Sequence, residues 1–146
     1  MKAGLTVGAL DALFAMALYR IDAVAVFHSV ASGLLGRGAY GGGLATAALG
    51  ALLHFCIATT WAAVYVGASL VVPAVARHAV PSGMTFGVAV YFFMNYVVLP
   101  LSAVPFARPF HLGLLTNGIW LIGLAGHMVL IGLTIALFTR RASLQA

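Results

Sequence analysis

Residues 44–72 read LATAALGALLHFCIATTWAAVYVGASLVV, a run of 29 residues without a single Asp, Glu, Lys or Arg. A helix that crosses a bilayer needs about 20 consecutive apolar residues. The run is therefore long enough to span a membrane and still to tilt or protrude. It predicts a membrane-spanning helix, and similar apolar runs lie on both sides of it.

The composition places the whole chain in the same class of protein. The 146 residues are 64% hydrophobic and 6% charged, whereas a soluble domain carries about 25% charged residues. Such a chain lacks the polar surface to cover a water-facing globule. We predict an all-α, polytopic membrane protein with one domain over residues 1–146. Its four-transmembrane-helix bundle is expected to use residues 4–19, 44–72, 84–99 and 112–139.

Charged residues and prolines mark the ends of these expected spans. Arg20 and Asp22 follow the first span. The turn after the second span contains Pro73, Arg77, His78 and Pro81. Pro100 kinks or stops the third span, because proline lacks a backbone N–H and its ring clashes with the preceding turn. Pro105 and Pro109 then indicate a loop before the fourth span.

The stretch 23–35, between the first two spans, predicts a helix of another kind. Asp22 is a good helix N-cap. Helical spacing is followed by Val24, Phe27, His28, Ala31 and Leu34. The stretch is too short to cross a bilayer, so an interfacial or re-entrant helix is expected. Asp22 is accordingly interpreted as a cap and not as a catalytic acid.

A literal G-x-G-x-x-G pattern, GRGAYG, follows at residues 36–41. A dinucleotide-binding unit needs a strand before this pattern and an acid about 20 residues after it. Here a helical pattern comes first, and the chain has no acid beyond Asp22. The glycines are therefore interpreted as a turn between two helices, with Arg37 and Tyr40 at the membrane interface.

The net charge of +5 does not indicate nucleic-acid binding. The seven bases stand one by one between apolar runs, except for the adjacent Arg140 and Arg141. Charges that flank membrane spans have this pattern, whereas a phosphate-binding stripe would cluster them. Four spans place Lys2, Arg77, Arg140 and Arg141 on one side, and Arg20, Arg37 and Arg108 on the other. This excess predicts both termini in the cytoplasm.

Two features near the start of the chain and in the second span have simple interpretations. Lys2 followed by apolar residues loosely fits a signal peptide, but Asp11 interrupts the apolar core. We therefore expect the first span to stay uncleaved. Cys56 is the only cysteine and lies in an apolar run, so it is expected to behave as a small hydrophobe.

Each expected span carries one strongly polar residue at depth, namely Asp11, His54, Asn95 and His127. An aspartate at mid-bilayer costs about 2.5 to 3.5 kcal/mol on insertion scales, so such groups usually face the interior of a bundle. Helical spacing places Asp11 with Gly4, Gly8 and Ala15, and His54 with Ala47, Gly50, Ala51 and Ala58. Likewise, Asn95 shares a face with Tyr91 and Ser102, and His127 with Thr116, Trp120, Gly123 and Thr134. Small residues allow close helix contact in lipid, so one interior polar cluster is expected.

Three interpretations of this cluster stay open. In the structural one, the groups form hydrogen bonds between helices, worth about 0.6 kcal/mol each on average. In the second, Asp11 and a histidine form a relay for protons or ions. In the third, His54 and His127 ligate a b-type haem from facing helices. No other cofactor and no metal is expected.

The residues for an enzyme are not apparent. No H-E-x-x-H sequence occurs, and no Ser-His-Asp grouping is implied by spacing. Two acids leave no carboxylate cluster for magnesium or calcium. His78 and His111 lie in predicted loops and are interpreted as ordinary interfacial residues.

The fourth expected span is rich in glycine, with Gly113, Gly118, Gly123, Gly126 and Gly132. Gly123 and Gly126 lie about one turn apart and admit a close neighbour, either another helix of the chain or a second copy. Four spans leave much surface toward the lipid bilayer. A homo-oligomer or docking to a larger membrane complex is therefore expected.

Four segments of the chain form a recognisable set: VGALDALFAMALY (7–19), FHSVASGLLGRGAYGGG (27–43), ALLHF (51–55) and MNYVVLPLS (94–102). Together they resemble an uncharacterised family of small bacterial four-span inner-membrane proteins. The resemblance covers roughly the first 105 residues. It implies the topology, a short helix ending in a similar Ala-Ser-Gly turn after the first span, and a bacterial inner membrane. It implies no activity, substrate or cofactor, so no role transfers to Asp11, His54 or Asn95.

The sequence therefore predicts a non-enzymatic structural or accessory protein of the bacterial inner membrane. The alternatives are a small proton- or ion-coupled transporter or channel that uses Asp11 and His54, and a b-type haem carrier.

Overall fold

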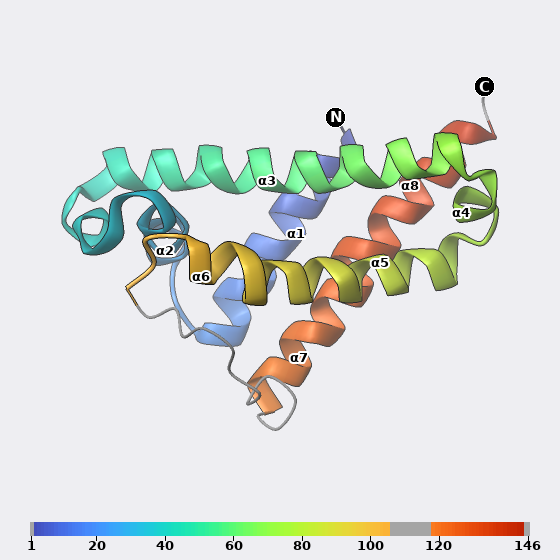
Figure 1. Cartoon of the computed structure of the whole chain (residues 1–146). Helices are drawn as coiled ribbons and strands as arrows, with labels where there is room; N and C mark the ends of the chain where they lie inside the picture. The colour runs from blue at the N-terminus through green and yellow to red at the C-terminus, as the bar shows by residue number, and fades with distance from the viewer. Residues whose placement is uncertain (1, 106–117, 145–146) are drawn as a thin grey trace.

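The computed structural model describes residues 2–105 and 118–144 (Figure 1). The described residues are helical or lie in turns and connections, and no strand occurs among them. Four helical stretches are long and apolar enough to cross a membrane: Lys2–Tyr19, Gly43–Val71, Ala79–Leu101 and Gly118–Ser143. This confirms the all-α prediction and the number of candidate spans. The expected start of the fourth span at residue 112 lies outside the described residues, as do Arg108, Pro109, His111, Gly113 and Thr116.

Helix α1 (Lys2–Tyr19) is followed by Arg20, whose backbone adopts a conformation that is usually found at glycine. Arg20 has a φ of 53°, in the left-handed region that side chains rarely adopt. The N–H of Ile21 donates to the Met16 carbonyl at 3.2 Å, which is the six-to-one hydrogen bond of a Schellman cap. The left-handed residue turns the chain out of α1 toward the next helix.

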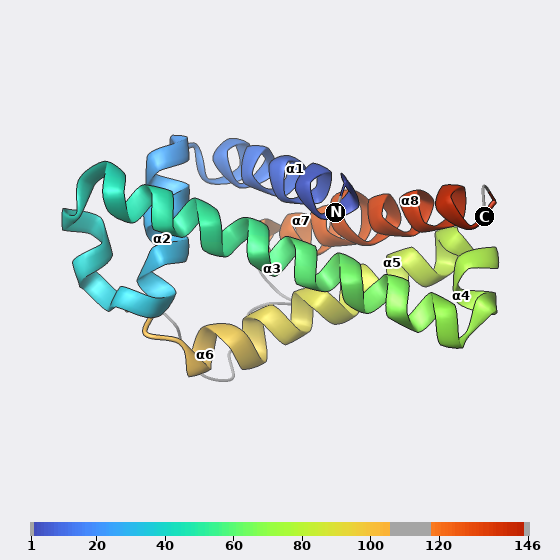
Figure 2. The same ribbon diagram turned by 90° about the horizontal axis from the view of Figure 1, so that it is seen from above.

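Helix α2 (Ala23–Leu35) has the predicted range and the predicted cap. The Asp22 carboxylate accepts a hydrogen bond from the Ala25 N–H at 2.8 Å, which satisfies one of the free donors of the first turn. The helix packs against α3 (Gly43–Val71) and crosses it steeply at one end of the molecule (Figure 2). A side chain at Gly50 would collide with the backbone of Phe27, so the two helices touch at the backbone.

The GRGAYG stretch forms a 3-10 helix, η1 (Gly36–Gly41), between α2 and α3. Gly36 and Gly43 bracket it with φ values of 58° and 59°, which only glycine adopts without strain. The glycines therefore break one helix and begin the next, as the sequence predicts. The connection is a tight helical turn that is part of the fold.

Prolines near the second and third candidate spans lie at helix starts. Pro73 occupies the first turn of a short helix, α4 (Pro73–Arg77), and Pro81 lies in the first turn of α5 (Ala79–Phe93). A proline costs little there, because the N–H that it lacks would have no helical partner. The expected plain turn over residues 73–81 is therefore corrected to a short helix followed at once by the next long one.

The third candidate span continues through Pro100, beyond the expected range 84–99. After α5 come a π-helical segment, η2 (Met94–Val98), and the last turn, α6 (Leu99–Leu101). The Leu99 N–H donates to the Met94 carbonyl, five residues back. This wider turn accommodates the proline that follows. Pro100 thus widens the helix before it ends.

The fourth candidate span is also interrupted by a π-helical segment. It consists of α7 (Gly118–Gly126), η4 (His127–Leu133) and α8 (Thr134–Ser143). The polar residue His127 opens the π-helical segment, just as Asn95 lies in the one of the third span. Such single-turn insertions in α-helices frequently occur at functional sites.

Two helix pairs pack closely through glycines. On α1, an added Cβ at Gly4 would lie 2.6 Å from the Thr59 Cα, and one at Gly8 would lie 2.6 Å from the Phe55 ring. On α5, Gly83 and Gly87 face η4, where Gly132 would collide with the Gly83 carbonyl if it carried a side chain. Gly83 and Gly87 form a GxxxG motif of the kind that brings helices together in membranes.

Gly123 and Gly126 of the fourth span face other helices of the same chain. An added Cβ at Gly123 would lie 3.4 Å from the Tyr91 ring, and one at Gly126 would collide with the Phe14 ring. The close neighbour expected for these glycines is therefore internal.

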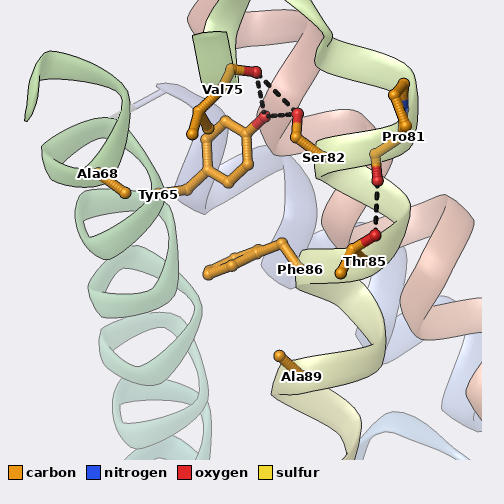
Figure 3. Close-up of a pocket in the computed structure, with 8 residues that line it drawn as sticks. All are labelled: Tyr65, Ala68, Val75, Pro81, Ser82, Thr85, Phe86 and Ala89. Atoms are coloured by element: carbon orange, nitrogen blue, oxygen red, sulfur yellow. Dashed lines mark hydrogen bonds between the residues drawn. The ribbon is translucent and has the colours of Figure 1, made fainter. Parts of the chain in front are cut away.

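Aromatic side chains join α3 to α5. Tyr65 packs against Phe86 with ring centroids 5.1 Å apart, and Trp61 packs against Phe86 and Phe93 at 6.0 and 5.3 Å. An open, mostly apolar groove of about 500 Å³ lies between the two helices (Figure 3). The adjoining core consists of Val7, Ala62, Tyr65, Ala79, Ile131, Ile135 and Ala136.

Candidate intramembrane polar site

Asp11 and His54 meet where α1 packs on α3. The His54 Nε2 lies 4.0 Å from the Asp11 Oδ2. With a rise of 1.5 Å per residue, Asp11 is roughly 14 Å along α1 from Lys2, well inside the candidate span. The structure therefore brings together two of the four polar residues singled out in the sequence.

A hydrogen bond to the backbone holds His54 in place. Its Nε2–H donates to the Gly8 carbonyl on α1 at 2.8 Å. A carbonyl oxygen only accepts hydrogen bonds, so Nε2 carries a proton. The Asp11 carboxylate, 4.0 Å from the same nitrogen, lies beyond hydrogen-bond distance. The ring also packs edge-to-face with Phe27 and Phe55, at centroid distances of 5.9 and 5.5 Å. His54 is thus a fixed bridge between α1 and α3.

Asp11 is less enclosed than its partner. Its side chain is 27% exposed, whereas that of His54 is 11% exposed. The residue lies at the edge of the buried stripe of α1 that contains Gly4, Gly8 and Ala12. The carboxylate therefore faces the margin of the α1–α3 contact and retains access to its surroundings.

His127 occupies a second polar contact, between the third and fourth spans. Its Nδ1–H donates to the Gly123 carbonyl of the preceding turn at 3.0 Å, which leaves Nε2 as the acceptor nitrogen. The ring packs edge-to-face on Tyr91 with centroids 5.1 Å apart. The Tyr91 hydroxyl in turn donates to the Trp120 carbonyl at 2.8 Å.

Asn95 does not take part in these contacts. Its Nδ2 donates to the Tyr91 carbonyl, one turn back on its own helix, at 2.8 Å. The structure thus joins Asp11 to His54 directly. It places His127 against Tyr91 and gives Asn95 a partner on its own helix.

The arrangement allows a limited set of chemistries. Within residues 2–105 and 118–144, no group of three His, Cys, Asp or Glu side chains is placed to hold a metal ion. A haem iron on the His54 Nε2 would require that nitrogen to give up its hydrogen bond to Gly8. The Asp11–His54 pair has the groups needed to hold a proton or a small cation.

Three polar anchors were not singled out in the sequence. The fully buried Tyr65 bonds the Ser82 hydroxyl at 2.8 Å and donates to the Val75 carbonyl at 3.2 Å (Figure 3). The His28 Nε2–H donates to the Gly43 carbonyl at 2.8 Å and so ties α2 to the start of α3. The sequence signal for His28 was its place on the apolar face of an amphipathic helix. Tyr65 and Ser82 carry no such signal.

Comparison with models of protein families, with curated proteins and with solved structures finds no match to this chain.

Proposed function

We propose that the chain is a non-catalytic four-helix membrane bundle that serves as a structural or accessory component, assembled with a second copy of itself or in a larger membrane complex. The observation that carries this proposal is the use of its polar groups. Within the described residues, no buried side-chain nitrogen or oxygen lacks a hydrogen-bond partner. His54, Tyr65 and Tyr91 each bond a group on another helical element. Polar side chains used in this way hold helices together and leave few groups for a substrate.

The proposed location is the bacterial inner membrane, with α2 at the membrane interface and both termini in the cytoplasm. The resemblance of the first 105 residues supports the inner membrane. The excess of basic residues beside the termini and after α3 supports the orientation, because cytoplasmic loops are enriched in Lys and Arg. Fusion of a cytoplasm-dependent reporter to either end of the chain tests the orientation.

Native mass spectrometry of the protein, extracted from its own membranes in mild detergent, tests the accessory role. We expect a second copy or a partner protein to be retained in fixed stoichiometry. The Asp11→Asn variant should retain the same copies or partner in the same stoichiometry, because the proposal gives Asp11 a packing role. A bare monomer at the sequence mass would contradict the proposal.

A second candidate function is a small proton- or ion-coupled transporter or channel. The observation that favours it is the Asp11 carboxylate, which is 27% exposed and lies 4.0 Å from the His54 Nε2. A titrating relay needs both an acid and a histidine within electrostatic reach and contact with water. Asp11 and His54 meet the first of these conditions, because the carboxylate and the imidazole lie 4.0 Å apart.

Cysteine accessibility tests the second condition. Asp11→Cys in a Cys56→Ser background would react with a membrane-impermeant maleimide if water reaches this position. Leu13→Cys is the matched control, because Leu13 lies on the same helix and is 61% exposed on a face that the proposal assigns to lipid. Labelling of Asp11→Cys alone supports a pathway. Equal absence of labelling at both positions contradicts it.

The haem hypothesis has a direct optical test. A b-type haem held by His54 and His127 predicts a Soret absorption in the purified protein that disappears in His54→Ala. Protein purified after expression with haem supplied, and lacking that absorption, would exclude the hypothesis.

A further inference from the structure

A second cavity, of about 390 Å³, lies at one end of the molecule, apart from the intramembrane polar site. The last turn of α3, the short helix α4 and the last turn of α8 surround it, and α4 and α8 lie side by side (Figures 1 and 2). Its polar lining consists of Ser69, Arg77, Arg140 and Ser143, and its apolar lining includes Leu70 and Leu144. Ligand sites in proteins begin at about this volume.

The two arginines bring an unbalanced charge into this cavity. Arg77 comes from α4 and Arg140 from α8, and the side chains of both remain exposed. The whole chain has only two acidic side chains. Asp22 caps α2, and Asp11 lies beside His54. No carboxylate side chain of this protein is therefore placed to neutralise the two guanidinium groups.

The remaining polar groups favour an anion that accepts hydrogen bonds. The Ser69 hydroxyl donates to the Val66 carbonyl at 2.7 Å, and the Ser143 hydroxyl donates to the Arg140 carbonyl at 2.9 Å. Among residues 2–105 and 118–144, the guanidinium groups of Arg77 and Arg140 are therefore the donors of this lining that have no hydrogen bond within the protein. Their planar forks match the oxygens of a phosphate group, to which arginine binds through paired hydrogen bonds.

The position in the fold identifies the source of that phosphate. Ser69 and Arg140 lie in the last turns of two candidate membrane spans, at the level where the headgroups of a bilayer begin. The apolar wall formed by Leu70 and Leu144 suits the glycerol and first acyl carbons next to a lipid phosphate. We propose that this cavity binds the phosphate of an anionic phospholipid, through Arg77 and Arg140. The proposal rests on the membrane insertion argued above and is independent of the accessory role.

The test uses the full-length protein in detergent with phosphatidylglycerol or phosphatidylcholine of the same acyl chains, and native mass spectrometry measures the bound lipid. The wild type should prefer phosphatidylglycerol. Arg77→Gln with Arg140→Gln should weaken the binding of that lipid by about 25-fold, because each basic contact with an anionic headgroup contributes about fivefold. The matched control is Arg37→Gln with Arg141→Gln, which removes the same charge from residues that do not line the cavity.

Each outcome decides the proposal. Retained preference in the control and its loss in the cavity variant would support the site. The pair Arg77→Lys with Arg140→Lys keeps the charge and should retain part of the preference, which guards against a variant that merely misfolds. Equal loss in both glutamine variants would overturn the site in favour of non-specific attraction. Displacement of the lipid by excess inorganic phosphate would overturn the lipid assignment and make a soluble phosphate compound the ligand.

Discussion

The backbone contact between α5 and η4 makes Gly87→Ala the sharpest structural prediction. The added carbon would lie 2.6 Å from the Met128 Cα and would collide with the His127 carbonyl oxygen. Carbon atoms pack best at about 3.5 to 4.0 Å, so the two helices would have to separate by roughly 1 Å. Overpacking of this kind costs about 1 to 3 kcal/mol. Alanine recovers up to about 1 kcal/mol through its helix propensity. The expected net loss of stability is about 0 to 2 kcal/mol relative to the wild type, and about 1 to 3 kcal/mol relative to an alanine that gains the same propensity without a collision.

The assay is reversible unfolding in mixed micelles, followed by circular dichroism. Gly67→Ala on α3 is the matched control, because an added Cβ there has no other atom within 4 Å. It should leave the free energy of unfolding unchanged or raise it slightly. Equal stability of Gly87→Ala and Gly67→Ala would refute the close packing of α5 on η4.

The same unfolding assay checks three further predictions. Arg20→Gly should stabilise the protein by about 1 kcal/mol, because it relieves an L-residue held at a φ of 53°; a destabilised variant would argue against the left-handed cap. Asp22→Ala should lower the free energy of unfolding by about 0.5 to 2 kcal/mol, whereas Asp22→Asn should keep most of the stability, because an amide oxygen also caps a helix. Similar losses in both variants would show that the Asp22 cap does not stabilise α2. Tyr91→Phe should cost about 0.6 kcal/mol, the average for a hydrogen bond within a membrane protein, and no loss would mean that the bond to Trp120 contributes nothing.

Much of the fold is predictable because it depends on local patterns. Long apolar runs identify the four candidate spans, and Asp22 identifies the start of α2. The prolines were harder to interpret, because Pro81 is harmless in a first turn and Pro100 is accommodated by a π-helical segment. The packing partners of Gly83 and Gly87 were not predictable, because the sequence does not say which helix they face.

The sequence identified the polar residues of the candidate site, but it predicted only some of their contacts. Helical spacing placed Asp11 on the face of Gly8 and His54 on a face of small residues, and the structure joins them there. The structure gives Asn95 a partner on its own helix, the Tyr91 carbonyl, because an amide can bond the carbonyl one turn back. Tyr65 and Ser82 were missed, because tyrosine and serine near span ends look like ordinary interfacial residues.

The proposal that Asp11 and His54 serve packing is tested most directly by proton flux into liposomes. Purified wild type and Asp11→Asn would be reconstituted at equal density with a pH-sensitive dye inside, and a pH gradient would be imposed. The account predicts that both proteins give the flux of protein-free liposomes. A wild-type flux above that background, lost in Asp11→Asn, would contradict the accessory role and establish Asp11 as part of a proton pathway.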